Sequence, residues 1–177
     1  MNVAVLTVSD RCSQGITTDT SGPALATLAQ QRLGATIIAT ACVPDEPDQI
    51  ARQLRHWALE SPKPDLILTT GGTGLSPRDI TPEATATVLE RRHPGLLELA
   101  RLRLYATTPR AFLSRGEAGT IGGTLVINLP GSPRAASEYL TALCDVLPHA
   151  VQTLRGEAAD HGRTDSGEAP AKSREAG

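Results

Sequence analysis

The sequence predicts an α/β fold in which a parallel sheet carries helices on both faces. Short apolar runs rich in β-branched residues alternate along the chain with segments whose apolar residues recur at helical spacing. Hydrophobic residues make up 40% of the 177 residues and aromatic residues only 2%, so the core must be built from Leu, Val, Ile and Ala. A strand–helix–strand–helix–strand order is typical of such a sheet, because each crossover helix packs on one of its faces.

Four apolar runs are predicted as strands. The first, residues 3–8, reads VAVLTV and stops at Ser9-Asp10. The polar residues 10–22 that follow are predicted as a loop. The remaining predicted strands are residues 35–43, 65–70 and 124–129.

Helical spacing of apolar residues predicts the intervening helices. Residues 23–33 carry a proline near the start and end before Gly34, and residues 48–60 place Ile50, Leu54 and Trp57 on one stripe. The other predicted helices are residues 82–91 (capped by Thr81), 96–104, 134–143 and 146–154. Residues 157–177 contain Ala, Gly, Ser and charged residues without an apolar period, which predicts a disordered tail behind a domain of residues 1–156.

Composition excludes several classes of function. The formal net charge is −2 with both signs mixed along the chain, so neither nucleic acid nor an anionic membrane is an expected partner. No run approaches the ~18 apolar residues of a membrane helix, and no signal peptide is recognised. Cys12, Cys42 and Cys144 are far apart and odd in number, which predicts free thiols. Together these features predict a cytoplasmic protein.

Polar or glycine-rich loops follow all four predicted strands. Because the carboxyl ends of parallel strands meet at one edge of a sheet, these loops are expected to form a ligand site there. They are Ser9-Asp10-Arg11, Pro44-Asp45-Glu46, Gly71-Gly72-Thr73-Gly74 and Pro130-Gly131-Ser132.

The glycine-rich loop and the residues after it have features of a phosphate site. Glycines let backbone N–H groups approach an anion closely, although such a short run taken alone is more often a tight turn. It fits neither the dinucleotide-binding fingerprint nor the P-loop. Arg78 is a candidate phosphate ligand, and the alternative is a surface ion pair between Arg78 and Asp79.

Asp45 and Asp79 are candidate metal ligands. Both follow predicted strands and are expected at the same edge of the sheet. An Asp near a phosphate usually needs Mg²⁺ between the two, since like charges repel. Capping of the next helix is the alternative role for Asp45. Two carboxylates at this edge suit a Mg²⁺–triphosphate site.

The motifs taken together resemble one family. In order they are Thr7-Val8-Ser9-Asp10, Asp19-Thr20-Ser21-Gly22, Val43-Pro44-Asp45-Glu46, residues 69–74, residues 77–85, Leu113-Ser114-Arg115 and residues 127–132. The chain resembles the molybdenum cofactor biosynthesis domain, in particular molybdopterin adenylyltransferases and the G domain of gephyrin, over about residues 3–156. The resemblance implies a three-layer α/β/α fold with a mostly parallel, molybdopterin-binding-like sheet, a homotrimer, and one elongated pocket for ATP and molybdopterin.

The resemblance also implies residue roles. Asp45 and Asp79 match the family's catalytic, Mg²⁺-associated aspartates. The implied nucleotide-binding residues are Ser9, Asp10, Gly71, Gly72, Thr73, Gly74 and Arg78, and the implied molybdopterin-binding residues are Ser114, Asn128, Pro130, Gly131 and Ser132. The implied reaction is in-line attack of the molybdopterin phosphate on the α-phosphorus of Mg²⁺–ATP, with pyrophosphate leaving. No general base is needed, because the nucleophile is already ionised.

One departure and three alternatives accompany the resemblance. Relatives often carry basic residues just before the last strand, where this chain has Ile121-Gly122-Gly123-Thr124, so Arg115 or Arg134 is expected to supply the missing cation. The main alternative is a non-catalytic module of the same fold that binds molybdopterin or acts as a scaffold. The second is a similar domain that acts on another nucleotide-like substrate, as in enzymes of nicotinamide-nucleotide salvage, and the third is a related bacterial paralogue group. Other proteins of molybdenum cofactor biosynthesis are expected partners.

Overall fold

The computed structural model describes residues 1–157 and contains one six-stranded mixed sheet. Its strands are β1 (Asn2–Val8), β2 (Thr36–Val43), β3 (Leu66–Thr70), β4 (Arg91–Arg92), β5 (Ala118–Ile121) and β6 (Thr124–Leu129), in the spatial order β2-β1-β3-β6-β5-β4. The first four positions in this order are parallel, and β5 and β4 are added antiparallel at one edge.

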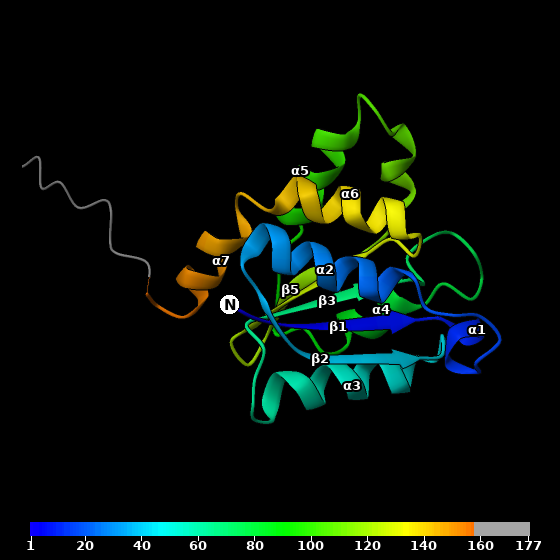
Figure 1. The fold of residues 1–177 in the computed structure, drawn as a ribbon, viewed down its shortest axis with the longest axis horizontal. Coiled ribbons are helices and arrows are strands. Elements are labelled where there is room, and N and C mark those ends of the chain that lie inside the picture. Colours follow the sequence, from blue (N-terminus) through cyan, green and yellow to red (C-terminus); the bar gives the residue numbers. More distant parts are fainter. Residues whose placement is uncertain (158–177) are drawn as a thin grey trace, which may run out of the picture.

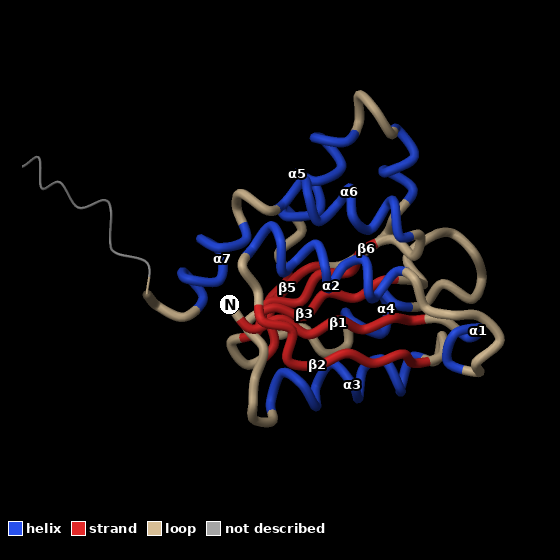
Figure 2. The backbone as a smooth tube through the Cα atoms, viewed as in Figure 1, coloured by secondary structure: helices blue, strands red, loops and turns tan. Residues whose placement is uncertain are grey.

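Helices cover both faces of the sheet, which confirms the predicted α/β fold (Figures 1 and 2). The α-helices are α1 (Asp10–Ser13), α2 (Ser21–Leu33), α3 (Pro47–Leu59), α4 (Thr81–Ala86), α5 (Gly95–Leu104), α6 (Pro133–Leu143) and α7 (Leu147–Leu154), and η1 (Pro109–Leu113) is a 3-10 helix. One apolar core joins the sheet to α2, α5, α6 and α7, and the other joins it to α3 and α4.

Strand β1 shows why the sequence has continuous apolar runs instead of alternating ones. Val3 and Val5 belong to the core under α2, whereas Ala4 and Leu6 belong to the core under α3. A strand between two helical layers buries both faces, so consecutive residues in it are apolar.

The strand order places a topological switch point between β1 and β3. The chain leaves β1 towards β2 on one side and returns to β3 on the other. The register aligns Val8 with Val43, Thr7 with Thr70, and Thr70 with Leu129, so the four parallel strands end at one level. Their arrows point to the side where α1 lies (Figure 1). Ligands of open α/β sheets bind at such a point.

The structure differs from the sequence-based prediction at three local elements. The expected loop of residues 10–22 contains α1, in which the Ser9 side chain caps the Cys12 N–H, and α2 begins earlier, at Ser21. The helix expected over residues 82–91 ends at Ala86. Thr85, Thr87 and Val88 are β-branched and lose side-chain freedom in a helix, which explains its early end.

Two strands were not predicted. Arg91–Arg92 (β4) pairs with Gly119 and Thr120 of β5, so the expected C-terminal end of the helix is instead an edge strand. Strands β5 and β6 form a hairpin around Gly122 and Gly123, which both have positive φ angles (53° and 91°). A Gly-Gly turn of this kind matches the twist of a hairpin and was the signal for β5.

The departure from the family pattern, the lack of basic residues at positions 121–124, lies in this hairpin. Residues 121–124 form the turn from β5 into the start of β6, so they lie at the amino edge of the sheet, opposite the edge where the parallel strands end. A Cβ on Gly122 would contact Leu59 at the end of α3. The absence of basic residues there therefore removes no cation from the carboxyl edge.

Three further predictions can be compared with the described residues. Cys12, Cys42 and Cys144 are free thiols, as predicted. Among the helices of residues 1–157, none is both long and apolar enough to cross a membrane. The tail prediction concerns residues 157–177, of which only Glu157 is described, and the rest lie outside the described residues.

Candidate functional site

Two cavities open at the carboxyl edge of the sheet and share a boundary. The first, about 460 Å³, lies beside α1 and the start of α2 and is lined by Ser9, Cys12, Asp19 and Asp45 among others. The second, about 360 Å³, lies beneath η1 and α6. Gly72, Asp79 and Gly131 line both. The two cavities therefore adjoin where the glycine-rich loop and Asp79 meet.

The glycine-rich loop follows β3 in a conformation that only glycine adopts readily. Gly71 has φ 107° and Gly72 has φ 61°. A Cβ on Gly71 would collide with the Val8 carbonyl at the end of β1, which shows how tightly the two strand ends meet. No hydrogen bond is found for the backbone N–H groups of Gly72, Thr73 or Gly74 within residues 1–157. The loop therefore presents free donors to an anion.

Asp45 and Asp10 hold each other at the edge of the first cavity. The Asp10 N–H donates to Asp45 Oδ2 (2.9 Å), and the Asp45 N–H donates to Asp10 Oδ1 (3.0 Å). Burial raises the pKa of the Asp45 carboxyl, the hydrogen bond from Asp10 opposes that shift, and the negative charges of Asp10 and Asp79 add to it. Glu46, not Asp45, is the N-cap residue of α3. The capping role considered for Asp45 is therefore wrong.

Asp79 lies on the other side of the glycine loop. Its Oδ2 accepts the Ser76 N–H (3.0 Å), and a Cβ on Gly74 would lie 2.8 Å from the same oxygen. Asp45 and Asp79 both line the first cavity, and the charge of Asp79 adds to the rise in the pKa of Asp45. The sequence-based expectation that they share an edge of the sheet is confirmed.

This donor set fits Mg²⁺ held together with a phosphorylated ligand. Within residues 1–157, no group of three or more His, Cys, Asp or Glu side chains could hold a metal ion by itself. Mg²⁺ usually binds through one or two carboxylates, and substrate phosphates and water complete its coordination. Two carboxylates beside unpaired N–H groups match that pattern.

Arg78 has partners that the sequence did not suggest. Its guanidinium donates to both oxygens of Asp10 (2.8–3.1 Å) and to Glu46 Oε1 (3.0 Å). The hydrogen bond from Arg78 lowers the pKa of the Asp10 carboxyl. Arg78 does not pair with its neighbour Asp79, and it lines neither cavity. Arg78 thus forms a clamp between the segments that follow β1, β2 and β3.

The expected molybdopterin-binding residues divide into two groups. Ser114, Pro130 and Gly131 line the second cavity, and the Ser114 hydroxyl donates to Thr73 Oγ1 at 3.2 Å. Ser132 is the N-cap of α6, where its Oγ accepts the Ala135 N–H. It does not line the second cavity.

Asn128, the remaining expected molybdopterin-binding residue, lines neither cavity. Its side chain is fully buried in β6, where Nδ2 donates to the hydroxyls of Thr69 and Thr85 (both 3.0 Å). Its Oδ1 accepts the Glu117 N–H (3.1 Å). The Asn128 side chain therefore makes its hydrogen bonds inside the protein, where it links β6 to β3 and α4.

The cation of the second cavity is also different from those expected. The Arg115 guanidinium donates to the carbonyls of Gly74 and Asp79 and pairs with Glu83, and Arg134 pairs with Glu138. Neither lines the cavity. Arg110 of η1 does line it, and this exposed side chain makes no hydrogen bond or ion pair within the described residues.

Sequence reasoning missed several residues that line the two cavities. Asp19 had been noted only in a helix-starting motif; its Oδ1 accepts the N–H groups of Ser21 and Gly22 and its Oδ2 accepts the Thr7 hydroxyl, at the wall of the first cavity. Others in the second cavity are Thr108, Arg110, Glu138 and Tyr139. They come from η1, the residue before it, and α6, which no sequence motif connects to the glycine loop.

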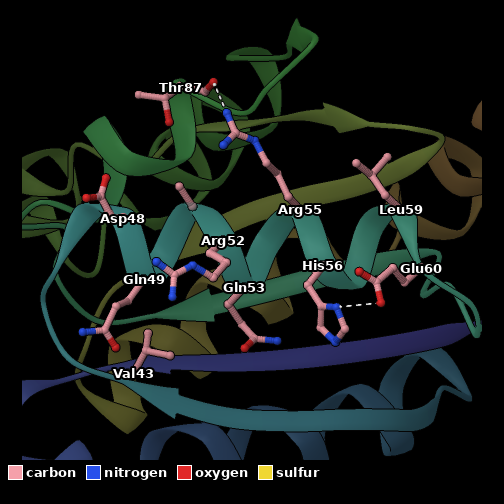
Figure 3. Close-up of a pocket in the computed structure, with 11 residues that line it drawn as sticks. Val43, Asp48, Gln49, Arg52, Gln53, Arg55, His56, Leu59, Glu60 and Thr87 are labelled. Atoms are coloured by element: carbon pink, nitrogen blue, oxygen red, sulfur yellow. Dashed lines mark hydrogen bonds and ion pairs between the residues drawn. The ribbon is translucent and has the colours of Figure 1, made fainter.

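A larger hollow of about 960 Å³ lies elsewhere, along the outer surface of α3 (Figure 3). Most of its side chains come from that helix. His56 pairs with Glu60 (3.0 Å), and Arg55 donates to the Thr87 carbonyl (3.4 Å). None of the sequence-predicted site residues lines it. Size alone therefore does not locate the chemistry.

Comparison with known proteins identifies the family of this chain. A family model described as "Probable molybdopterin binding domain" matches residues 4–149. The chain belongs to this family. It is thus a molybdopterin-binding domain of molybdenum cofactor biosynthesis, and the resemblance drawn from the sequence motifs is confirmed.

Individual relatives agree with this membership of the molybdopterin-binding family. The chain is 45% identical to the molybdenum cofactor synthesis protein cinnamon of Drosophila melanogaster over 85% of its length, but it spans only 25% of that protein. It is 40% identical to a molybdopterin adenylyltransferase of Helicobacter pylori, covering 88% of this chain and 89% of the relative. The structure of the molybdopterin biosynthesis enzyme MoaB from Thermus thermophilus superposes with a TM-score of 0.81 at 49% identity, covering 88% and 96% of the two chains.

Proposed function

We propose that this chain is a molybdopterin adenylyltransferase, which transfers AMP from ATP to the phosphate of molybdopterin. The observation that carries the proposal is the junction of the two cavities, where Asp45 and Asp79 flank a glycine loop with unpaired N–H groups. A reaction between two phosphorylated substrates needs two adjoining sites that meet where the phosphates react. The similarity to the adenylyltransferase of Helicobacter pylori supports the same activity.

The residues that line each cavity support a different substrate for each. ATP occupies the first cavity, with its phosphates against the loop of Gly71 to Gly74 and the start of α2. Molybdopterin occupies the second cavity, beside Ser114 and Arg110, with its phosphate directed to the junction at Asp79. Arg110 replaces Arg115 and Arg134 as the proposed cation for this anionic substrate.

The residues act mainly by positioning. The N–H groups of the glycine loop hold the phosphates of ATP, and the second cavity aligns the molybdopterin phosphate for attack on the α-phosphorus as pyrophosphate leaves. Asp45 and Asp79 would hold Mg²⁺, which neutralises the charge of the triphosphate when bound. The clamp of Arg78, Asp10 and Glu46 keeps the Asp45 loop in place. No side chain is required as a general base, because a phosphate is ionised at neutral pH.

A second candidate function is binding of molybdopterin without AMP transfer. It is favoured by the 49% identity to the Thermus thermophilus MoaB, whose name does not specify adenylyl transfer. In both candidates the domain is formed by residues 1–156, and we propose that it assembles as a homotrimer and receives molybdopterin from another protein of the same biosynthesis.

The decisive experiment supplies purified protein with molybdopterin and Mg²⁺–ATP and measures AMP-molybdopterin and pyrophosphate. We expect product with wild type and none with Asp79→Ala. Arg91→Ala, on the antiparallel edge strand β4, is the matched control for a surface substitution and should keep full activity. Binding of molybdopterin without any AMP transfer by wild type would establish the second candidate instead.

A further inference from the structure

The side chain of Thr81 is an exception among the buried hydroxyls of this protein. Thr81 opens α4 and is fully buried, yet its Oγ1 has no hydrogen-bond partner within residues 1–157. Other buried threonines are satisfied: Thr70 donates to the Pro130 carbonyl, Thr124 donates to the Pro64 carbonyl, and Thr69 accepts from Asn128. Burying a polar group without a hydrogen-bond partner lowers the stability of the folded protein, so such groups are rare.

The orphaned hydroxyl lies at the candidate site. The Thr81 N–H donates to the Gly72 carbonyl (3.0 Å), which fixes the start of α4 against the glycine loop. A Cβ on Gly72 would overlap Thr81 Oγ1 and would lie 2.9 Å from Asp45 Oδ1. Both oxygens therefore converge on the same face of Gly72, and they can be no farther apart than the sum of these two contacts.

Asp45 Oδ1 is the free oxygen of its carboxylate. The other oxygen, Oδ2, accepts the Asp10 N–H, whereas Oδ1 takes part in no hydrogen bond within the described residues. An unpaired hydroxyl and an unpaired carboxylate oxygen thus face one small space next to Gly72. One hydroxyl proton and one acceptor oxygen suit a bridging water or a hydrated divalent cation.

We propose that Thr81 is a positioning residue for Asp45. When the site is loaded with Mg²⁺ and nucleotide, its hydroxyl donates to Asp45 Oδ1, directly or through one water, and fixes the direction in which the carboxylate faces the cation. This inference rests on the proposed function, because it assumes that Asp45 binds a divalent cation. It also explains why position 72 has no room for a side chain.

The test compares Thr81→Val, which keeps the shape and removes the hydroxyl, with Thr81→Ser, which keeps the hydroxyl. Mn²⁺ affinity is measured by electron paramagnetic resonance, Mg²⁺–ATP affinity by calorimetry, and the melting temperature without ligand by calorimetric scanning. We expect Thr81→Val to melt at the wild-type temperature or above it, because no hydrogen bond is lost. Its Mn²⁺ and Mg²⁺–ATP dissociation constants should rise about tenfold. Thr81→Ser should bind like wild type.

Three results would separate the possibilities. Wild-type affinities in Thr81→Val would overturn the role of Thr81 and leave the proposed function intact. Equal losses of affinity in Thr81→Val and Thr81→Ser would also overturn it, since the missing hydroxyl would then not be the cause. If wild type itself binds neither Mn²⁺ nor Mg²⁺–ATP, the proposed function fails first, and the role of Thr81 fails with it.

Discussion

Asp45 and Asp10 each use a carboxylate oxygen to accept the other residue's N–H, and this exchange joins the ends of β1 and β2. It also brings two negative charges together, with Asp79 as a third nearby. Arg78 neutralises Asp10 from the outside, but no cationic side chain contacts Asp45 in the described part of the chain. Negative charge therefore accumulates around Asp45, which raises the pKa of its carboxyl.

The charge on Asp45 should lower the stability of the protein. Because burial raises its pKa in the folded state, the folded protein binds more protons than the unfolded chain between the ordinary and the raised pKa. The contribution of this group to stability therefore falls as pH rises through that window and stays low above it.

Replacing Asp45 by Asn tests whether the charge on Asp45 lowers the stability of the protein. Asn can still accept the Asp10 N–H but carries no charge, so Asp45→Asn should melt at or above the wild-type temperature at neutral pH and have no measurable transferase activity. The difference in melting temperature should shrink as pH falls below the ordinary pKa of Asp, as thermal scans between about pH 3 and pH 7 would show. A variant that is less stable than wild type at every pH would contradict the prediction.

Arg110 should determine affinity for the molybdopterin substrate. A charge-assisted hydrogen bond from its guanidinium contributes about 1.5–3 kcal/mol, so Arg110→Gln should weaken molybdopterin binding about 10- to 100-fold. ATP affinity should stay unchanged, because Arg110 lines only the second cavity. Titration of each substrate separately gives both values. Arg52→Gln, on the exposed surface of α3, is the control and should alter neither affinity.

Polar side chains, one buried and one exposed, link the helices and strands around the site. Asn128 ties β6 to Thr69 of β3 and to Thr85 of α4, and it also accepts from Glu117 just before β5. On the surface, Arg78 ties the loop before α4 to α1 and to the N-cap of α3. These two links, one inside and one outside, fix α4 relative to the glycine loop.

The role of Asn128 as a link between elements predicts a loss of stability and not of affinity. Asn128→Ala removes two donated hydrogen bonds and one accepted hydrogen bond and leaves a cavity, so it should lower the free energy of unfolding by about 2–4 kcal/mol. Chemical denaturation measures this loss.

The contrasting variant is Ser114→Ala, which changes a cavity-lining hydroxyl. It should lower molybdopterin affinity several-fold with little effect on the free energy of unfolding. The expectation fails if Asn128→Ala, compared at equal folded fraction, loses as much molybdopterin affinity as Ser114→Ala does.

At the scale of the whole molecule, the site lies at the switch point between β1 and β3 and is completed by helices from the far end of the chain. The first cavity uses residues up to Pro133, and the second extends to Tyr139 of α6. Residues 4–149 match the family, and α7 adds Leu147 and Val151 to the core. All residues proposed to contact the substrates therefore lie before α7.

A truncated protein should accordingly keep the fold and the function. Residues 1–157 alone are expected to show the melting temperature and the substrate affinities of the full chain, because the cores and both cavities lie within them. Truncation after Leu143 should instead destabilise the protein strongly, since it removes the buried side chains of α7. Equal thermal stability of these two truncated forms would contradict the expected contribution of α7.

Local sequence patterns accounted for much of the fold and part of the site. The apolar runs of β1, β3 and β6 and the apolar stripe of α3 are visible in single segments. A strand buried on two faces needs a continuous apolar run, and a helix buried on one face needs a helical period. Short elements were missed. The two-residue strand β4 has no internal pattern and exists only because β5 pairs with it.

The sequence by itself determined the α/β fold, the family, and the placement of Asp45 and Asp79 at one edge of the sheet, since these follow from periodicity and from motifs of consecutive residues. Only the tertiary structure decided the strand order, the pairing of Arg78 with Asp10, the burial of Asn128, and the positions of Arg110 and Thr81 at the site. Each of these depends on which distant segments become neighbours. The packing of two helical layers on one sheet decides which segments become neighbours, and the local hydrophobic pattern of the sequence does not indicate it.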